Sequence, residues 1–212
     1  MPEFRTEPLV VPTVSGILPE GERDRRVALT SFLSNAERAK IPMREVTCYE
    51  CGEVSQVPMA ALSANCIHCH AHLNMSDVLI RPGSRRLTVR TLGNVVVPQG
   101  TSLSNLSVVC NNMEVNGRVS GTFRCTGVLT FNVSTEVDGS IIAEKLVIDK
   151  GAEVKLMVGA VAENVELFGK LKGRLQCKGV LHVCRGASYE GVCKAADVVV
   201  EPGGQFEDLS RA

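Results

Sequence analysis

The sequence predicts an all-β protein whose main part is a right-handed parallel β-helix, a solenoid of about seven to eight coils. Pairs of apolar residues recur every 16–19 residues from residue 78 onward. Glycines follow most of these pairs at a fixed distance. Aromatic residues make up only 4% of the chain and Trp is absent, so the apolar residues are mainly Val, Leu, Ile and Ala. This composition is typical of many short strands joined by tight turns.

Composition and charge exclude several classes of protein. Lys+Arg and Asp+Glu both number 23, so the molecule as a whole has no long-range attraction to nucleic acid or to an anionic membrane. No apolar run reaches the ~20 residues that span a bilayer, and residues 1–22 are unlike a secretory signal. Two CxxC pairs among nine cysteines favour reduced thiols. We therefore expect a cytoplasmic protein, with association at the inner face of the membrane as an open alternative.

Residues 1–44 are predicted to form a disordered tail, because they are rich in Pro and balanced in charge. Residues 24–40 have the pattern of a short amphipathic helix. The residues with the spacing of one helix face are Leu29, Phe32, Leu33 and Ala36. We interpret this segment as a transient helix in a disordered arm, and a docking or membrane-surface element is the alternative.

Residues 45–76 are predicted to form a small zinc ribbon. Cys48 and Cys51 form one CxxC knuckle, Cys66 and Cys69 form another, and 14 residues separate the two. This spacing lets both knuckles face one ion and complete a closed tetrahedral set of four thiolates. A module of this size cannot bury enough apolar surface to fold alone, so we expect structural zinc to drive its folding.

Two alternatives to zinc stay open at this site, namely iron in a rubredoxin-like centre and a metal-free group of thiols. His68, His70 and His72 crowd the second knuckle, and one of them could replace a cysteine as ligand. We interpret these histidines as surface groups or as groups that orient the ligands. A closed four-cysteine site leaves no position for water or substrate, so catalytic zinc is not expected.

A basic stretch joins the ribbon to the main repeat and contains Arg81, Arg85, Arg86 and Arg90 with no acidic residue among them. We interpret these arginines as the solvated outer face of the first coil. The alternative is that they form a contact surface for nucleic acid or membrane together with the ribbon.

The β-helix is predicted for residues 77–208 from an internal repeat. In each repeat two apolar residues stand two positions apart, so both point to the same face of a strand. Stacked coils place equivalent positions above one another, and each position then forms an interior ladder. The pairs are Val78/Ile80, Val95/Val97, Met113/Val115, Leu129/Phe131, Leu146/Ile148, Val165/Leu167, Leu181/Val183 and Val198/Val200.

Further positions repeat in the same way. A turn glycine follows most pairs, at Gly83, Gly100, Gly151, Gly186 and Gly203. A second apolar position holds Leu103, Val119, Val137, Val154, Leu171, Tyr189 and Phe206. A third strand places Phe123, Ile141, Leu175 and Cys193 two residues after Gly121, Gly139, Gly173 and Gly191. A row of small residues follows, at Cys110, Cys125, Ala143, Ala160, Cys177 and Ala195. We interpret Cys125 and Cys177 in this row as buried and inert.

This Gly- and Val-rich ladder resembles the bactofilin domain. The segments MEVNGRVSGTFRCTG and STEVDGSIIAEKLVIDKGAEV carry the resemblance, which is close from about Met113 to Phe206 and looser over 77–112. The resemblance implies a bacterial cytoskeletal protein with a right-handed β-helix between disordered tails. It also implies assembly into non-polar filaments through the helix ends, without nucleotide. The four-cysteine ribbon departs from the simplest members of the family.

The C-terminal end of the ladder is predicted to be an assembly surface centred on Phe206. Phe206 occupies the second apolar position of the last coil, where a solenoid leaves strand edges and one core layer uncovered. Residues 209–212 are expected to form a short tail. The alternative is that the last residues fold back over Phe206.

The sequence therefore predicts a non-enzymatic scaffold whose main partner is itself and which organises cell-wall or membrane-associated proteins. A nucleic-acid-binding zinc ribbon on a β-helix platform is the second hypothesis. An acyltransferase of the hexapeptide-repeat class is the third, although strict hexads are absent and His182 is expected on the outer face of a strand. No small-molecule substrate is expected, because no carboxylate pair, nucleophile–base pair or phosphate loop stands out.

Overall fold

A computed structural model describes residues 41–84 and 87–211. The predicted helix over 24–40 lies outside the described residues, as do Arg85 and Arg86. Met43–Ala212 form one compact unit, which holds both the ribbon and the solenoid. Within the described ranges no helix is long and apolar enough to cross a membrane.

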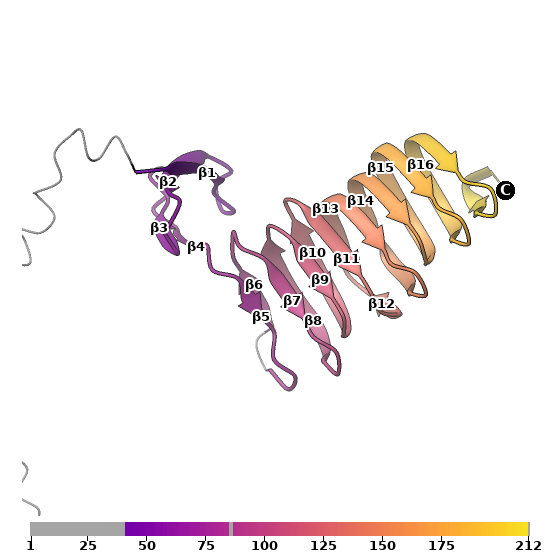
Figure 1. Cartoon of the computed structure of the whole chain (residues 1–212), viewed down its shortest axis with the longest axis horizontal. Coiled ribbons are helices and arrows are strands. Elements are labelled where there is room, and N and C mark those ends of the chain that lie inside the picture. Colours follow the sequence, from indigo (N-terminus) through magenta and orange to yellow (C-terminus); the bar gives the residue numbers. More distant parts are fainter. Residues whose placement is uncertain (1–40, 85–86, 212) are drawn as a thin grey trace, which may run out of the picture. The chain divides into compact units, whose positions relative to one another are not determined.

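The ribbon consists of two antiparallel hairpins (Figure 1, indigo and violet). Strand β1 (Met43–Thr47) pairs with β2 (Val54–Pro58), and β3 (Ser63–Asn65) pairs with β4 (His72–Asn74). Cys48 follows β1 directly and Cys66 follows β3 directly. Each cysteine knuckle therefore lies in the turn between the two strands of one hairpin.

A parallel β-solenoid follows, in which the described residues form one sheet of 13 strands (Figure 1). In chain order the strands are β5 (Val78–Leu79), β6 (Thr88–Arg90), β7 (Val95–Val97), β8 (Ser102–Cys110), β9 (Met113–Val115), β10 (Arg118–Cys125), β11 (Val128–Phe131), β12 (Thr135–Val137), β13 (Ser140–Ile148), β14 (Glu153–Leu167), β15 (Lys170–Val183), β16 (Ser188–Val200) and β17 (Gln205–Asp208). A short 3-10 helix, η2 (Leu209–Arg211), comes after β17. All pairings within this sheet are parallel, as a coiled chain requires.

The predicted ladder of apolar pairs is confirmed along its whole length. Each pair lies opposite the next in the hydrogen-bonded register, from Val78 opposite Val95 to Val183 opposite Val200. The pairs of β7, β9, β11, β13, β14 and β15 are at most 2% exposed. Strands with period-two side chains thus form one continuous apolar core inside the coils.

The predicted turn glycines have the left-handed backbone that only glycine adopts without strain. Gly83, Gly100, Gly151, Gly186 and Gly203 have φ values of 75°, 77°, 85°, 80° and 92°. The third-strand glycines must also lack a side chain, because the backbones of neighbouring coils touch at these positions. A Cβ atom on Gly191 would lie 1.9 Å from the carbonyl oxygen of Gly173 in the coil before it.

The row of small residues contains one error of prediction. Ala143 pairs with Ala162, and Ala162 pairs with Cys177, so Ala162 and not Ala160 belongs to this row. Ala160 lies instead opposite Ile141 and Leu175. The prediction assumed an even spacing that the longest coil does not keep.

The cause is a two-residue bulge in β14. Leu156 pairs with Gly173 and Ala160 pairs with Leu175, so β14 carries two more residues than β15 over this interval. The extra residues, Met157 and Val158, are 63% and 55% exposed. In the same long coil Val137 lies opposite Leu156 rather than opposite Val154, its predicted neighbour. A bulge of this kind moves side chains outward while the ladders continue on both sides of it.

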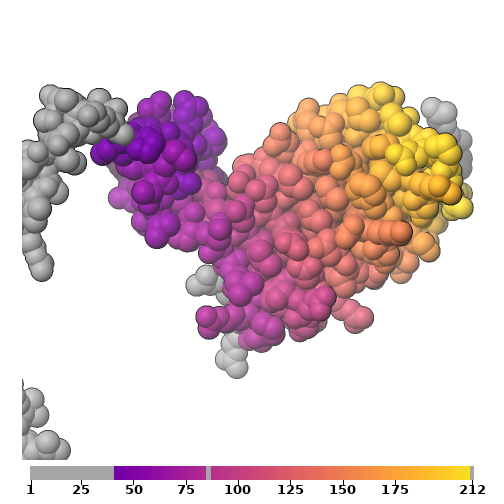
Figure 2. Space-filling model, viewed as in Figure 1, coloured from indigo at the N-terminus to yellow at the C-terminus, as the bar shows by residue number. Residues whose placement is uncertain are grey.

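The two ends of the solenoid, at β5 and at β17, differ in how far their inward side chains are buried. Ile80 and Val89, in the first coil, are 4% and 3% exposed. In the last coil Val200 is 42% exposed, although its partner Val183 is fully buried. Strands β16 and β17, yellow in Figure 2, form this second end.

Candidate metal centre and assembly end

The four cysteines predicted as metal ligands come together in the ribbon. The Sγ atoms of Cys48 and Cys69 are 3.7 Å apart, as are those of Cys51 and Cys66, and all four lie within 4.8 Å of one another. Four thiolates arranged tetrahedrally at the usual Zn–S distance of about 2.3 Å have edges of about 3.8 Å. The donor set and its spacing therefore fit a Zn²⁺ ion.

The turn backbone fixes this arrangement. The N–H of Gly52 donates to the carbonyl of Cys48 over 2.9 Å, and the N–H of His70 donates to the carbonyl of Cys66 over 3.0 Å. Gly52 and His70 both have positive φ, of 78° and 59°. The two knuckles thus have the same local shape, with a left-handed residue just after the second cysteine of each.

The electrostatics of the cluster favour a cation. Backbone N–H groups of Cys69 and His68 lower the pKa of the Cys66 thiol to about 6. A backbone hydrogen bond from Glu53 lowers the pKa of Cys51, but desolvation and hydrogen bonds with the other three cysteines outweigh it and raise that pKa to about 12. Thiols this close together cannot all ionise unless a positive charge lies among them.

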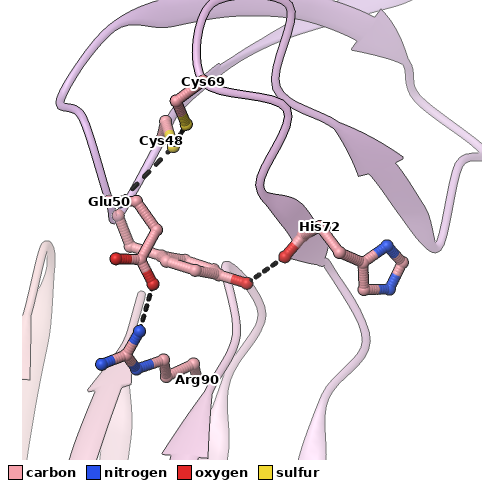
Figure 3. Close-up of polar contacts among 6 residues, drawn as sticks. Cys48, Glu50, Cys69, His72 and Arg90 are labelled. Atoms are coloured by element: carbon pink, nitrogen blue, oxygen red, sulfur yellow. Dashed lines mark hydrogen bonds and ion pairs between the residues drawn. The ribbon is translucent and has the colours of Figure 1, made fainter.

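The three histidines of the second knuckle do not join the cluster, since the described metal-ligand group there contains the four cysteines alone. The ring of His72 lies 3.4 Å from the Asn65 side chain and points away from the sulfurs (Figure 3). A four-thiolate site without an open position can stabilise a fold but offers no place for a substrate.

Contacts that the sequence did not indicate join the ribbon to the first coils. Arg90 forms an ion pair with Glu50 of the ribbon (Figure 3). Leu92 packs against the apolar cluster of the ribbon, and its N–H donates to the carbonyl of Asn74 over 2.7 Å. Partners 40 residues apart, such as Arg90 and Glu50, leave no periodic pattern that a single sequence could reveal.

Of the predicted arginine surface, the structure describes Arg81 and Arg90, and both are exposed. Because Arg90 is paired with a ribbon carboxylate, its charge is partly neutralised. Two of the four arginines are thus described, and one of them, Arg90, already forms a contact within the chain.

Phe206 lies at the C-terminal end, as predicted, and is partly buried. Its ring stacks on Tyr189 at a centroid distance of 5.5 Å and an interplanar angle of 18°. Tyr189 is 1% exposed, and its hydroxyl donates to the carbonyl of Gly173 over 2.9 Å. Asp208, the last residue of β17, accepts hydrogen bonds from the N–H groups of Cys193 and Ser210, and helix η2 follows it.

Comparison with known proteins gives a match for part of these coils. Residues 67–159 match the family model of bactofilin, described as polymer-forming cytoskeletal. Over these residues the chain is similar to the bactofilin domain. No curated protein and no solved structure matched the chain. The bactofilin match starts earlier and stops earlier than the stretch of closest resemblance predicted above, while the solenoid itself continues to β17.

The bactofilin family is a cytoskeletal family rather than an enzyme family. Together with the parallel solenoid, the bactofilin match supports a polymer-forming cytoskeletal protein.

Proposed function

We propose that this protein is a self-assembling scaffold that forms filaments without nucleotide by joining solenoid ends. The filament would organise partner proteins, and those of the cell envelope are the partners we expect. The observation that carries this proposal is the uncovered C-terminal coil.

The last coil leaves exposed both an apolar side chain and an open strand edge, and a second chain can pair with either. Val200 belongs to an inward ladder whose other members are buried, yet it is 42% exposed. Strand β17 pairs with Ser188–Gly191 of β16 and leaves the remainder of β16 without a strand beyond it among the described residues. Open strand edges and an uncovered apolar layer are features that pair with a second copy or must be covered.

Phe206 is the proposed anchor of this contact. It is partly buried against Tyr189, and a large aromatic side chain in such a position loses further solvent contact when a second surface covers it. The polymer interface would then extend the apolar core of one chain into the next.

The ribbon is proposed to hold a structural Zn²⁺ ion through Cys48, Cys51, Cys66 and Cys69. When bound, the ion neutralises the crowded thiolates and fixes the two hairpins to each other. The contacts of Leu92 and Arg90 would then hold the folded ribbon against the first coils.

Sedimentation of a Phe206→Arg variant tests the assembly end. The substitution lies in the outermost layer, so the coils should keep their β-sheet circular dichroism while assembly falls. Phe168→Arg is the matched control, because Phe168 is 40% exposed on a turn in the middle of the solenoid and not at an end. If Phe206→Arg sediments as fully as the parent, or if Phe168→Arg disrupts assembly equally, the C-terminal end is not the joint.

A further inference from the structure

A second group of metal-ligating side chains lies on the outside of the solenoid, far along the sequence from the ribbon. It consists of His182, Cys184 and Glu201, whose ligand atoms all lie within 4.8 Å of one another. His182 stands between the inward residues Leu181 and Val183 on β15 and therefore points outward. Cys184 is the first turn residue after Val183, and Glu201 is its equivalent one coil later, after Val200.

The distances within this group are short. His182 Nε2 lies 3.2 Å from Glu201 Oε1, and His182 Nδ1 lies 4.0 Å from Cys184 Sγ. Cys184 is 7% exposed, while the side chains of His182 and Glu201 are 36% and 41% exposed. The thiol is thus shielded at the base of the group, and the imidazole and the carboxylate remain open to an entering ion.

The same three positions occur earlier in the solenoid with different chemistry, which provides an internal comparison. Glu114 occupies the outward position of β9, and Asn116 and Asn132 occupy the matching turn positions. Both amides donate to Glu114 Oε1 over 3.0 Å, so this set is a closed network of hydrogen bonds. At His182, Cys184 and Glu201 the equivalent positions hold an imidazole, a thiol and a carboxylate, which are all ligand types for zinc.

We propose that His182, Cys184 and Glu201 form a second metal site that binds one Zn²⁺-class ion with three protein ligands and an open fourth position. For tetrahedral zinc, nitrogen and oxygen ligands at about 2.0–2.1 Å are about 3.3 Å apart, close to the observed histidine–carboxylate distance. One ion uses one imidazole nitrogen, so binding requires the His182 ring to turn between the thiol and the carboxylate, whereas the strand backbone stays in place.

The backbone around the group already orients one ligand. The N–H of Arg185 donates to Glu201 Oε2 over 2.9 Å, which leaves Oε1 directed at His182. A hydrogen bond to a ligating carboxylate of this kind fixes its orientation in metal sites. Because the side chains of His182 and Glu201 are partly exposed, a fourth ligand from solvent has room to enter.

Zinc content of the full-length protein tests this site separately from the ribbon. After equilibration with Zn²⁺ and removal of free metal, we expect Cys184→Ser and His182→Ala each to contain one ion fewer than the parent. Glu201→Gln should raise the Kd for this ion by more than about 10-fold. Glu166→Gln is the control, because Glu166 lies opposite His182 in the sheet but outside the ligand group.

Combination with the ribbon variant separates the two sites. Cys48→Ser/Cys66→Ser should keep the solenoid ion, and adding Cys184→Ser should remove it. An unchanged zinc content in both Cys184→Ser and His182→Ala overturns the proposal, whatever the ribbon does. Loss of all zinc in the ribbon variant alone also overturns it. His182→Ala changes an outward side chain, so it remains informative if Cys184→Ser disturbs the turn.

Discussion

At the first coil of the solenoid the inward residues Ile80 and Val89 are 4% and 3% exposed, whereas at the last coil the inward residue Val200 is 42% exposed. Both coils are built from the same repeat, so the repeat does not explain the difference. The first coils are continuous with the ribbon, into whose apolar cluster Leu92 packs. The last coil ends in β17, and η2 follows it; neither covers Val200. The chain outside the repeat therefore differs between the two ends, and the last coil is the one with an exposed inward residue.

The largest effect should come from removing the ribbon's ligands. Cys48→Ser/Cys66→Ser should contain one zinc ion fewer than the parent and lose the folded ribbon, because the ribbon's own apolar cluster is small. The β-sheet circular dichroism of the solenoid should survive, since its core is separate. Cys177→Ser, which leaves the ribbon intact, is the control. An unchanged zinc content would show that the four cysteines do not hold the ion.

A matched pair of truncations compares an inner coil with the open end directly. Val183→Ala should lower the free energy of unfolding by about 2–3 kcal/mol, because Val183 is fully buried. Val200→Ala, one coil later in the same ladder, should lower it by less than about 0.5 kcal/mol in the unassembled chain. Denaturant unfolding measures both values. Equal losses would mean that the last coil is as well covered as the others.

Larger side chains in the small-residue row should also be less well tolerated in an inner coil than in the last one, with a smaller difference in the free energy of unfolding. Cys177→Leu should lower the free energy of unfolding by about 1–3 kcal/mol, because Cys177 is 3% exposed and has neighbours in both adjacent coils. Ala195→Leu, at the paired position of the last layer, should be tolerated better. In the native protein Cys125 should resist alkylation, since hydrogen bonding to Cys110 and burial both raise the pKa of its thiol. Rapid modification of Cys125 would contradict the ladder.

The smallest effect is expected at the ion pair between ribbon and coil. Arg90 and Glu50 are both about half exposed, with side-chain exposures of 51% and 41%. A double-mutant cycle with Arg90→Ala and Glu50→Ala should give a coupling energy of about 0.2–1 kcal/mol that falls as salt is added. A coupling near zero would leave Leu92 as the main contact between the two regions.

The sequence was sufficient to predict that the eight apolar pairs stack and that the four cysteines come together. Both features follow spacing rules that the backbone enforces locally. It failed at Ala160, since a constant period cannot reveal a bulge that adds two residues to one coil. The sequence also did not predict that Glu201 lies close to His182 and Cys184. That approach depends on the turn position that Cys184 and Glu201 share in successive coils, a relation that becomes visible when turn residues are aligned as well as apolar ones.

The bulge at Met157 and Val158 has a consequence for where such a molecule can carry extra residues. The inward ladders pass from β14 to β15 without interruption on either side of it, with Val154 opposite Leu171 and Ala162 opposite Cys177. The two extra residues of β14 therefore lie at the surface, although the buried Val137 lies opposite Leu156 instead of Val154 in this coil. A solenoid of this kind can therefore carry an outward feature in one coil while its inward ladders continue in the coils on both sides.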